Sequence, residues 1–264
     1  MHDNPLGTNL SRRAVLVGTL GTGLAMTAVG NSFASPSTSS APATAGSAAG
    51  AATLTVLATT DIHGHVYDWD YFADAPYPPS DKGRSSAPLG VSRVATIVKQ
   101  LRAEKGADSV VTLDNGDTIQ GTPLTYLSAK QPEKLGRTEV MARAFNLVGY
   151  DAANIGNHEF NYGLKELNRY KNDLDAPLLC ANVIDLKTGK PLTQGTLMLT
   201  KTVDGHQVKV GVVAVTTPGS MVWDKANLTG KVDIADPVKT AAKCSVTLRK
   251  DCLLYTSPSP RDKR

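Results

Sequence analysis

Short apolar runs alternate along the chain with longer segments in which apolar residues recur at helical spacing. Strands are predicted where the runs are short, apolar and bounded by polar residues, at residues 54–60, 110–113, 152–155 and 178–183. Helices are predicted where apolar residues recur every third or fourth position, at residues 89–104, 138–147 and 164–170. Gly106 and Gly149 follow the first two of these helices, as is typical of helix C-termini.

A tight hairpin is predicted after the last of these strands. Residues 197–203 and 208–215 are rich in β-branched residues and flank Asp204-Gly205, a dipeptide typical of two-residue turns. His206 is placed in that turn and is expected to be solvated. Residues 68–87 are aromatic and contain proline, which predicts a long loop. Strand–helix alternation followed by a hairpin indicates a layered α/β fold with a mixed sheet.

Polar side chains follow three of the predicted strands. Asp61 and His63 come after the first strand, Asp117 after the second and Asn157 after the third. Open α/β sheets place their sites at the carboxyl ends of their strands, so these residues are expected to meet there. Carboxylate, imidazole and amide groups together suit divalent cations, and the set predicts a site for two ions. His158, next to Asn157, could face the substrate and protonate a leaving oxygen.

Each of these motifs also has a structural interpretation. Asp-x-His, Gly-Asp and Asn-His all occur in ordinary turns, and it is their order at three strand ends that favours a metal site. His65 either lines the site or is an exposed loop residue. Glu159 either orients a metal ligand or is a carboxylate at a helix start.

The first 52 residues are predicted to lie outside the folded domain. Residues 1–34 resemble a twin-arginine (Tat) export signal, with Arg12-Arg13 before an apolar, glycine-rich stretch and Ser32-Phe33-Ala34 as the cleavage pattern. A membrane anchor is the alternative, but the apolar stretch is short and broken by glycine. Residues 35–52 contain only Ala, Ser, Thr, Pro and Gly, which predicts a flexible linker. A periplasmic, cell-wall or secreted location is therefore expected, without a stable membrane anchor.

The other end and the charge add two further expectations. Residues 252–262 resemble a translated sequencing adapter, so residues 252–264 are interpreted as read-through of the coding sequence into adapter DNA. A natural Pro/Ser-rich tail is the alternative. The net charge of +4 comes largely from basic residues in the leader and in this tail, so no nucleic-acid polymer is expected as a partner. Cys180 lies in an apolar run, which indicates a buried thiol rather than a disulfide.

Three motifs carry a resemblance to a known family. Residues 59–63 (TTDIH), 114–121 (DNGDTIQG) and 156–164 (GNHEFNYGL) resemble the calcineurin-like metallophosphoesterases, in particular the 5′-nucleotidase branch. Within that branch they are most similar to the bacterial group that hydrolyses 2′,3′-cyclic nucleotides and 3′-nucleotides. Residues 180–183 (CANV) and 223–228 (WDKANL) extend the resemblance, which runs from about residue 53 to about residue 234.

The resemblance implies specific roles and a specific reaction. The implied metal ligands are Asp61, His63, Asp117 and Asn157, with His158 as the catalytic side chain and Asn161, Glu159 and Asn182 as supporting residues. Two divalent ions are implied, with Zn²⁺, Mn²⁺ or Co²⁺ all suited to such ligands. The substrate would be a small nucleotide: a 2′,3′-cyclic nucleotide would be opened to a 3′-nucleotide, which would then release nucleoside and phosphate. Asn161 favours this group, because the 5′-nucleotidases typically have Asp there.

The chain departs from the family pattern after the hairpin. The family completes its metal site with later histidines, including a Gly-His-x-His turn, whereas His206 is the only histidine after His158 here. The expected fold is therefore a metallophosphoesterase-type sandwich with mixed sheets, spanning residues 53–251 and truncated before its last strands and before a C-terminal nucleotide-binding domain. An inactive fragment is expected. The alternatives are a 5′-nucleotidase or nucleotide-sugar hydrolase of the same family, or a non-catalytic metal- or phosphate-binding module.

Overall fold

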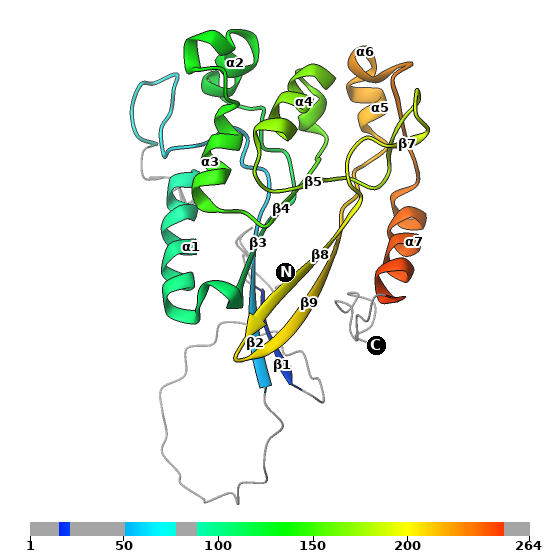
Figure 1. Cartoon of the computed structure of the whole chain (residues 1–264). Coiled ribbons are helices and arrows are strands. Elements are labelled where there is room, and N and C mark those ends of the chain that lie inside the picture. The colour runs from blue at the N-terminus through cyan, green and yellow to red at the C-terminus, as the bar shows by residue number, and fades with distance from the viewer. Residues whose placement is uncertain (1–15, 22–50, 78–88, 251–264) are drawn as a thin grey trace, which may run out of the picture.

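A five-stranded mixed sheet forms the centre of the molecule (Figure 1). The computed structural model describes residues 16–21, 51–77 and 89–250. In spatial order the sheet contains β1 (Leu16–Gly21), β2 (Ala51–Thr59), β3 (Val110–Asp114), β4 (Ala152–Asn154) and β5 (Leu178–Leu179). Strands β2 to β5 are parallel, and β1 pairs antiparallel with β2. The mixed sheet expected from the sequence is confirmed.

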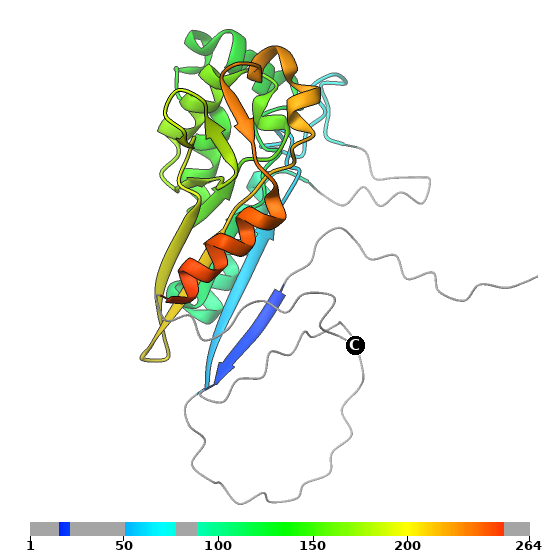
Figure 2. The ribbon, with the colours of Figure 1, turned by 90° about the vertical axis from the view of Figure 1, so that its right-hand side faces the viewer.

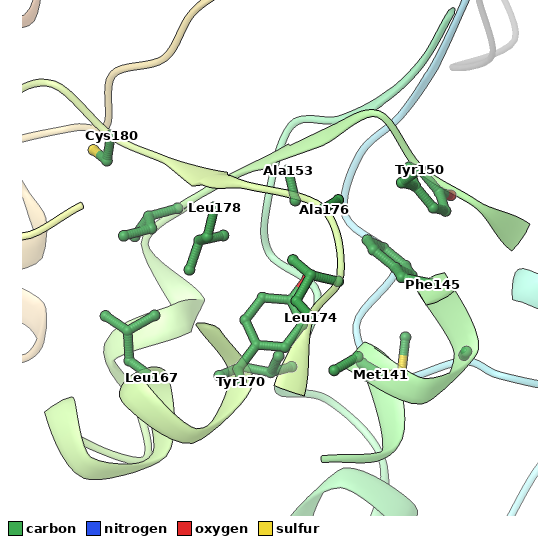
Figure 3. Close-up of a cluster of buried hydrophobic side chains, with 14 of the residues drawn as sticks. Met141, Phe145, Tyr150, Ala153, Leu167, Tyr170, Leu174, Ala176, Leu178 and Cys180 are labelled. Carbon is green, nitrogen blue, oxygen red and sulfur yellow. The ribbon is translucent and has the colours of Figure 1, made fainter. Parts of the chain in front are cut away.

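Helices cover one face of this sheet (Figure 1). They are α1 (Val91–Lys105), α3 (Val140–Val148) and α4 (Leu164–Asp173), and each follows a predicted helical segment closely. Met141, Phe145 and Tyr170 are fully buried between the helices and the sheet (Figure 3). Cys180 lies in the same core and is a free thiol, as expected. Burial of such large side chains is the main source of stability for this layer.

A long hairpin packs on the opposite face of the sheet. Strands β8 (Thr196–Val203) and β9 (His206–Val213) pair along their whole length. The turn residues Asp204 and Gly205 both have positive φ, 49° and 76°, as a two-residue turn of the favoured hand requires. Side chains of β8, β9, β2 and β3 interdigitate in a second apolar cluster, around Leu54, Val111 and Val203. The result is the predicted layered α/β sandwich.

Two details of the predicted strands are wrong. Residues 178–183 form two strands, because the chain leaves the central sheet after β5 and enters a three-stranded antiparallel sheet of β10 (Val232–Ile234), β6 (Val183–Asp185) and β7 (Lys190–Pro191). The buried Asn182 side chain makes this switch by bonding to the backbone of Thr216 and Ala235. His206 is exposed as expected, but it is the first residue of β9 rather than a turn residue.

Several helices and 3₁₀ turns, most of them short, were not predicted. They are α2 (Pro123–Lys130), α5 (Ser220–Trp223), α6 (Lys225–Leu228), α7 (Pro237–Lys250) and the 3₁₀ turns η1 (Ala107–Ser109), η2 (Pro132–Leu135) and η3 (His158–Phe160). Helix α7 runs beside the hairpin, on the side of the molecule away from α1 (Figures 1 and 2). No helix in the described ranges is long and apolar enough to cross a membrane.

The predicted leader, linker, loop and tail lie mostly outside the described residues. Of the leader, residues 16–21 are described and form β1. Ala51 and Ala52, the last two residues of the predicted linker, belong to β2. Residues 68–77 of the predicted loop contain only an isolated bridge between Asp70 and Ala75. The read-through interpretation of residues 252–264 concerns residues that the structure does not describe.

A buried carboxylate at the start of α3 generates the first prediction. Glu139 caps the helix by accepting a hydrogen bond from Ala142 N at 2.7 Å. Burial raises the pKa of Glu139 from 4.5 to about 7, against the opposing effect of that hydrogen bond. A raised pKa means that this group favours the folded state below about pH 4.5 and progressively loses that contribution as the pH rises through about 7.

Glu139→Gln keeps an oxygen acceptor and removes the titration. The free energy of unfolding of the variant minus that of the wild type should be larger at about pH 8 than at about pH 5, by on the order of 2 kcal/mol. Denaturant unfolding at the two pH values measures this difference. The exposed Glu133→Gln is the control and should show no such gain. An equal effect of Glu139→Gln at both pH values would contradict the assignment.

Candidate metal centre

The loops that follow β2 and β3 lie against each other through backbone hydrogen bonds. Asp61 N donates to Gly116 O at 3.1 Å, and His63 N donates to Asp117 O at 2.9 Å. Gly64 N continues the ladder with a bond to Thr118 O at 2.8 Å. The parallel register of β2 and β3 therefore continues into the loops and brings their polar residues to one edge of the sheet.

Three predicted ligands have an unusual backbone conformation. Asp61, His63 and Asp117 have φ values of 53°, 49° and 59°, and they are half of the six non-glycine residues with positive φ in the described ranges. This region is sterically unfavourable for a residue with a Cβ, by about 1–3 kcal/mol each. Strain concentrated on three neighbouring polar residues indicates a functional site that the surrounding structure holds in place.

Two glycines allow the loops after β3 and β4 to approach closely. A Cβ on Gly156 would lie 2.6 Å from Asp117 N, and a Cβ on Gly116 would lie 2.8 Å from Gly156 Cα. Both positions therefore exclude side chains. The contact lets Asp117 Oδ1 accept a hydrogen bond from His158 N at 2.8 Å, which ties the second and third loops together.

The side chains of His63, Asp117 and His158 converge. One ligand atom of each lies within 4.8 Å of the other two, and the two imidazole rings are 4.9 Å apart. Asp61 Oδ1 lies 3.7 Å from His63 Nε2, so a fourth donor adjoins the group. Two imidazoles and two carboxylates at this spacing fit a divalent cation. His63, Asp117 and His158 are partly buried and Asp61 is exposed, so the group can be reached from solvent.

A hydrogen bond at Nδ1 fixes the ring orientation of His63. Its Nδ1 lies 3.0 Å from Gln120 O, and a carbonyl oxygen can only accept a hydrogen bond. Nδ1 therefore carries a proton, and Nε2, which lies 3.7 Å from Asp61 Oδ1, is the ring atom left to bind an ion when the ring is neutral. This is the usual arrangement of a metal-binding histidine, whose second nitrogen donates to a carbonyl or a carboxylate.

Glu159 holds two of the loops together. Its fully buried carboxylate accepts hydrogen bonds from Gly156 N at 2.7 Å, Asp117 N at 2.8 Å, Thr118 N at 2.6 Å and Ile119 N at 3.3 Å. Burial raises the pKa of Glu159, and the backbone donors oppose that shift. The donors come from the loops that carry Asp117 and His158, so Glu159 fixes the backbone of two predicted site residues; its effect on a metal ligand stays a prediction.

Asp114 supports the same loop and was not identified from the sequence. Its buried carboxylate accepts hydrogen bonds from Thr59 Oγ1 at 2.6 Å, Thr118 Oγ1 at 2.8 Å and Gly116 N at 3.0 Å. Burial raises the pKa of Asp114 to about 7. The signal was available, since Asp114 begins the DNGDTIQG motif.

His158 is hydrogen-bonded to Asn161, and Asn161 in turn to Asp224. His158 Nδ1 lies 2.8 Å from Asn161 Oδ1. Asn161 Nδ2 donates to Asp224 Oδ1 at 3.1 Å and to Oδ2 at 3.0 Å. The sequence predicted that Asn161 supports His158, but it did not indicate Asp224, which follows Trp223 in the WDKANL segment.

The remaining candidates have different surroundings. Asn157 adjoins the cluster through the backbone, and its role as a ligand stays a prediction. Within the described residues, the Asn182 side chain bonds to Cys180, Thr216 and Ala235 and not to a predicted ligand, so its observed role is in the strand switch. The half-buried His65 packs its ring edge-on against Tyr77, and burial lowers its pKa.

Comparison with known proteins places this geometry in a family. The family model for calcineurin-like phosphoesterases matches residues 54–220. A 2′,3′-cyclic-nucleotide 2′-phosphodiesterase/3′-nucleotidase of Yersinia enterocolitica is 41% identical over 202 residues, which are 75% of this chain and 29% of that protein. A 5′-nucleotidase of Vibrio vulnificus is 30% identical over 199 residues, which are 75% of this chain and 31% of that protein.

A solved structure agrees with both matches. The crystal structure of the calcineurin-like phosphoesterase YfkN from Bacillus subtilis superposes with a TM-score of 0.65 at 33% identity, covering 75% of this chain and 59% of that one. The chain thus spans about three tenths of the length of these curated relatives. The family implies divalent metal ions, which the cluster of His63, Asp117 and His158 suits. The chain belongs to the calcineurin-like phosphoesterase family.

Proposed function

We propose that the protein is a metal-dependent nucleotide phosphoesterase that opens 2′,3′-cyclic nucleotides to 3′-nucleotides and then releases nucleoside and phosphate. The observation that carries the proposal is the convergence of His63, Asp117 and His158 at the carboxyl edge of the sheet. The substrate class is supported by the 41% identity to the Yersinia relative that bears this activity in its name.

The proposed metal site uses the residues at the ends of β2, β3 and β4. Asp61, His63, Asp117 and Asn157 would hold two divalent ions of Zn²⁺, Mn²⁺ or Co²⁺ type. When bound, such ions supply Lewis-acid activation of the phosphoryl group and of the attacking water. Asp117 would be a well-oriented ligand, because hydrogen bonds from both neighbouring loops hold its backbone and its carboxylate.

His158 is proposed to act on the substrate directly. Its Nδ1 is engaged by Asn161, which leaves Nε2 as the ring atom available to the site. A ring that has also taken up a proton on Nε2 can donate a hydrogen bond from that atom to a phosphoryl oxygen, or pass the proton to the departing ribose oxygen. A ring held by a hydrogen bond is oriented before the substrate arrives, which lowers the entropic cost of reaching the transition state.

A 5′-nucleotidase is the second candidate, supported by the 30% identity to the Vibrio relative. The side chain at position 161 favours the first candidate. It is an amide in this chain, and its oxygen is the observed partner of His158. In the 5′-nucleotidases that the motif resembles, an aspartate is typical there.

We also propose that the protein acts outside the cytoplasm. Arg12-Arg13 and the Ser32-Phe33-Ala34 pattern support export by the Tat route. Replacing Arg12 and Arg13 together by lysine should abolish export of a reporter fused after residue 52, as followed by cell fractionation. Export that survives this replacement would contradict the Tat assignment.

The substrate proposal predicts an order of activities. With Zn²⁺, Mn²⁺ or Co²⁺ present, phosphate release from 3′-AMP, and from 2′,3′-cyclic AMP through 3′-AMP, should exceed release from 5′-AMP. The assay uses the longest product of the gene, because the chain spans only about three tenths of its relatives. A preference for 5′-AMP would favour the second candidate.

The role of His158 predicts a kinetic effect in the same assay. His158→Gln should lower kcat by about 10²–10⁴-fold, because the ring's contribution to acid–base or charge stabilisation is lost. His206→Gln, at the exposed start of β9, is the matched control and should retain wild-type kcat. Equal kcat for both variants would exclude His158 from the chemistry.

Replacing Glu159 should lower metal affinity, although Glu159 is not one of the proposed ligands. In Glu159→Gln one carboxylate oxygen becomes an NH₂ group, which must face backbone N–H donors of the Asp117 loop or of Gly156. The displaced loop should weaken Zn²⁺ or Mn²⁺ binding by about 10–100-fold in titration calorimetry. The exposed Glu104→Gln is the control, and unchanged affinity in a folded Glu159→Gln protein would contradict this role.

A further inference from the structure

Asp224 lies one hydrogen bond behind the partner of His158. Both of its carboxylate oxygens accept from the Asn161 amide nitrogen, at 3.1 Å and 3.0 Å. Asp224 is 63 residues away from Asn161 in the sequence and only 8% exposed. No lysine, arginine or histidine forms an ion pair with it in the part of the chain that the structure describes. Its acceptors are directed at amide groups.

This contact determines which way the Asn161 amide points. In the opposite orientation the amide oxygen would face two carboxylate oxygens at about 3 Å, and none of the three could donate. An asparagine without such a neighbour can present either its oxygen or its nitrogen to a histidine. Asp224 therefore compels the amide oxygen to face His158.

The amide orientation in turn determines the tautomer of His158. An amide oxygen only accepts, so His158 Nδ1, at 2.8 Å, must carry the proton. The neutral ring then has its lone pair on Nε2, the nitrogen left for the site. With a reversed amide, the ring would accept at Nδ1 and carry its proton on Nε2, which is the wrong form for accepting a proton or binding an ion there.

Asn227 clamps the same two segments together. Its Nδ2 donates to Phe160 O at 2.9 Å and to Asn161 O at 3.2 Å, and it lies 3.4 Å from Asp224 Oδ1. The short helices α5 and α6 are therefore tied to both the backbone and the side chain of the turn that bears His158. These contacts give the WDKANL segment a structural role, although it contains none of the predicted metal ligands.

We propose that Asp224 is a positioning residue that fixes the amide of Asn161 and, through it, the Nδ1–H tautomer and the orientation of the His158 ring. Asp224 does not reach the substrate, and no proton transfer to it is involved. The catalytic consequence of this arrangement rests on the proposed function, whereas the tautomer itself does not.

The tautomer can be measured without turnover. In the full chain labelled with ¹⁵N-histidine, the ring nitrogen shifts of His158 report which nitrogen carries the proton, at about pH 8.5 where an ordinary histidine is neutral. The His158→Gln variant identifies the resonances. Spectra are recorded without metal and with Zn²⁺. Wild-type protein without metal should show only the Nδ1–H form, and an Nε2–H form or an equal mixture would overturn the proposal whatever the variants do.

Two variants separate positioning from a merely structural role. In Asp224→Asn, the new amide can face Asn161 with either end, so the His158 signals should shift toward a tautomer mixture and kcat should fall by about 10–100-fold, with little change in KM. The double variant Asn161→Asp with Asp224→Asn places the carboxylate next to His158 and should restore the Nδ1–H form and most of kcat. Asp204→Asn, in the exposed hairpin turn, is the matched control.

The outcomes distinguish this proposal from the proposed function. Wild-type tautomer in a folded Asp224→Asn protein, or failure of the folded double variant to restore the Nδ1–H form, would overturn the role of Asp224. If Asp224→Asn does not fold, the wild-type and double-variant spectra still decide. If the tautomers are as expected but the protein does not hydrolyse nucleotides, the proposed function would be wrong and the positioning role of Asp224 would stand.

Discussion

The geometry of the whole site depends on the buried carboxylate of Glu159. Asp117 and Thr118 donate their N–H groups to Glu159, and their carbonyls accept from His63 N and Gly64 N. The same two residues therefore connect the loops after β2 and β4 through the loop after β3. Hydrogen bonds to a charged group contribute about 1.5–3 kcal/mol each, and losing a buried partner leaves an unsatisfied donor at similar cost. Four such bonds outweigh the tendency of any single loop to relax.

That constraint accounts for the strained backbone of the ligands. Positive φ at Asp61, His63 and Asp117 costs about 1–3 kcal/mol per residue, which the isolated loops would relieve. The inter-loop hydrogen bonds and the close glycine contact between Gly116 and Gly156 are of the same total order and hold the conformation. The carboxylates and imidazoles are thus already arranged in the structure without a metal, so binding of an ion by them would not have to fold the loops first.

The sequence predicted the local parts of this arrangement well and the distant parts poorly. Apolar periodicity identified β2, β3, β4, α1, α3, α4 and the hairpin, because each buries its own apolar face. It missed the break after Leu179, since the run stays apolar while the chain changes sheets at Asn182. The short α2 was missed although Thr122 and Pro123 form a typical helix start, since its eight residues carry little periodicity.

The same division separates the predicted from the unpredicted site residues. The proximity of Asp61, His63, Asp117 and His158 could be predicted, because parallel strands bring their carboxyl ends to one edge of the sheet. Asp224 lies between the short helices α5 and α6 and meets Asn161 only in the folded structure, so no local pattern distinguishes it from an ordinary helix-cap aspartate.

The contact with Asp224 also changes what the amide at position 161 means. Considered alone, Asn161 lacks the negative charge of an aspartate and can only orient His158. Asp224 lies 3.0 Å from the Asn161 amide nitrogen, so a carboxylate is hydrogen-bonded to the amide rather than to His158 itself. The positive end of the amide dipole points toward this carboxylate. The groups therefore run in the order carboxylate, amide and imidazole, so hydrogen bonds fix the orientation of the ring while the charged group stays out of direct contact with it.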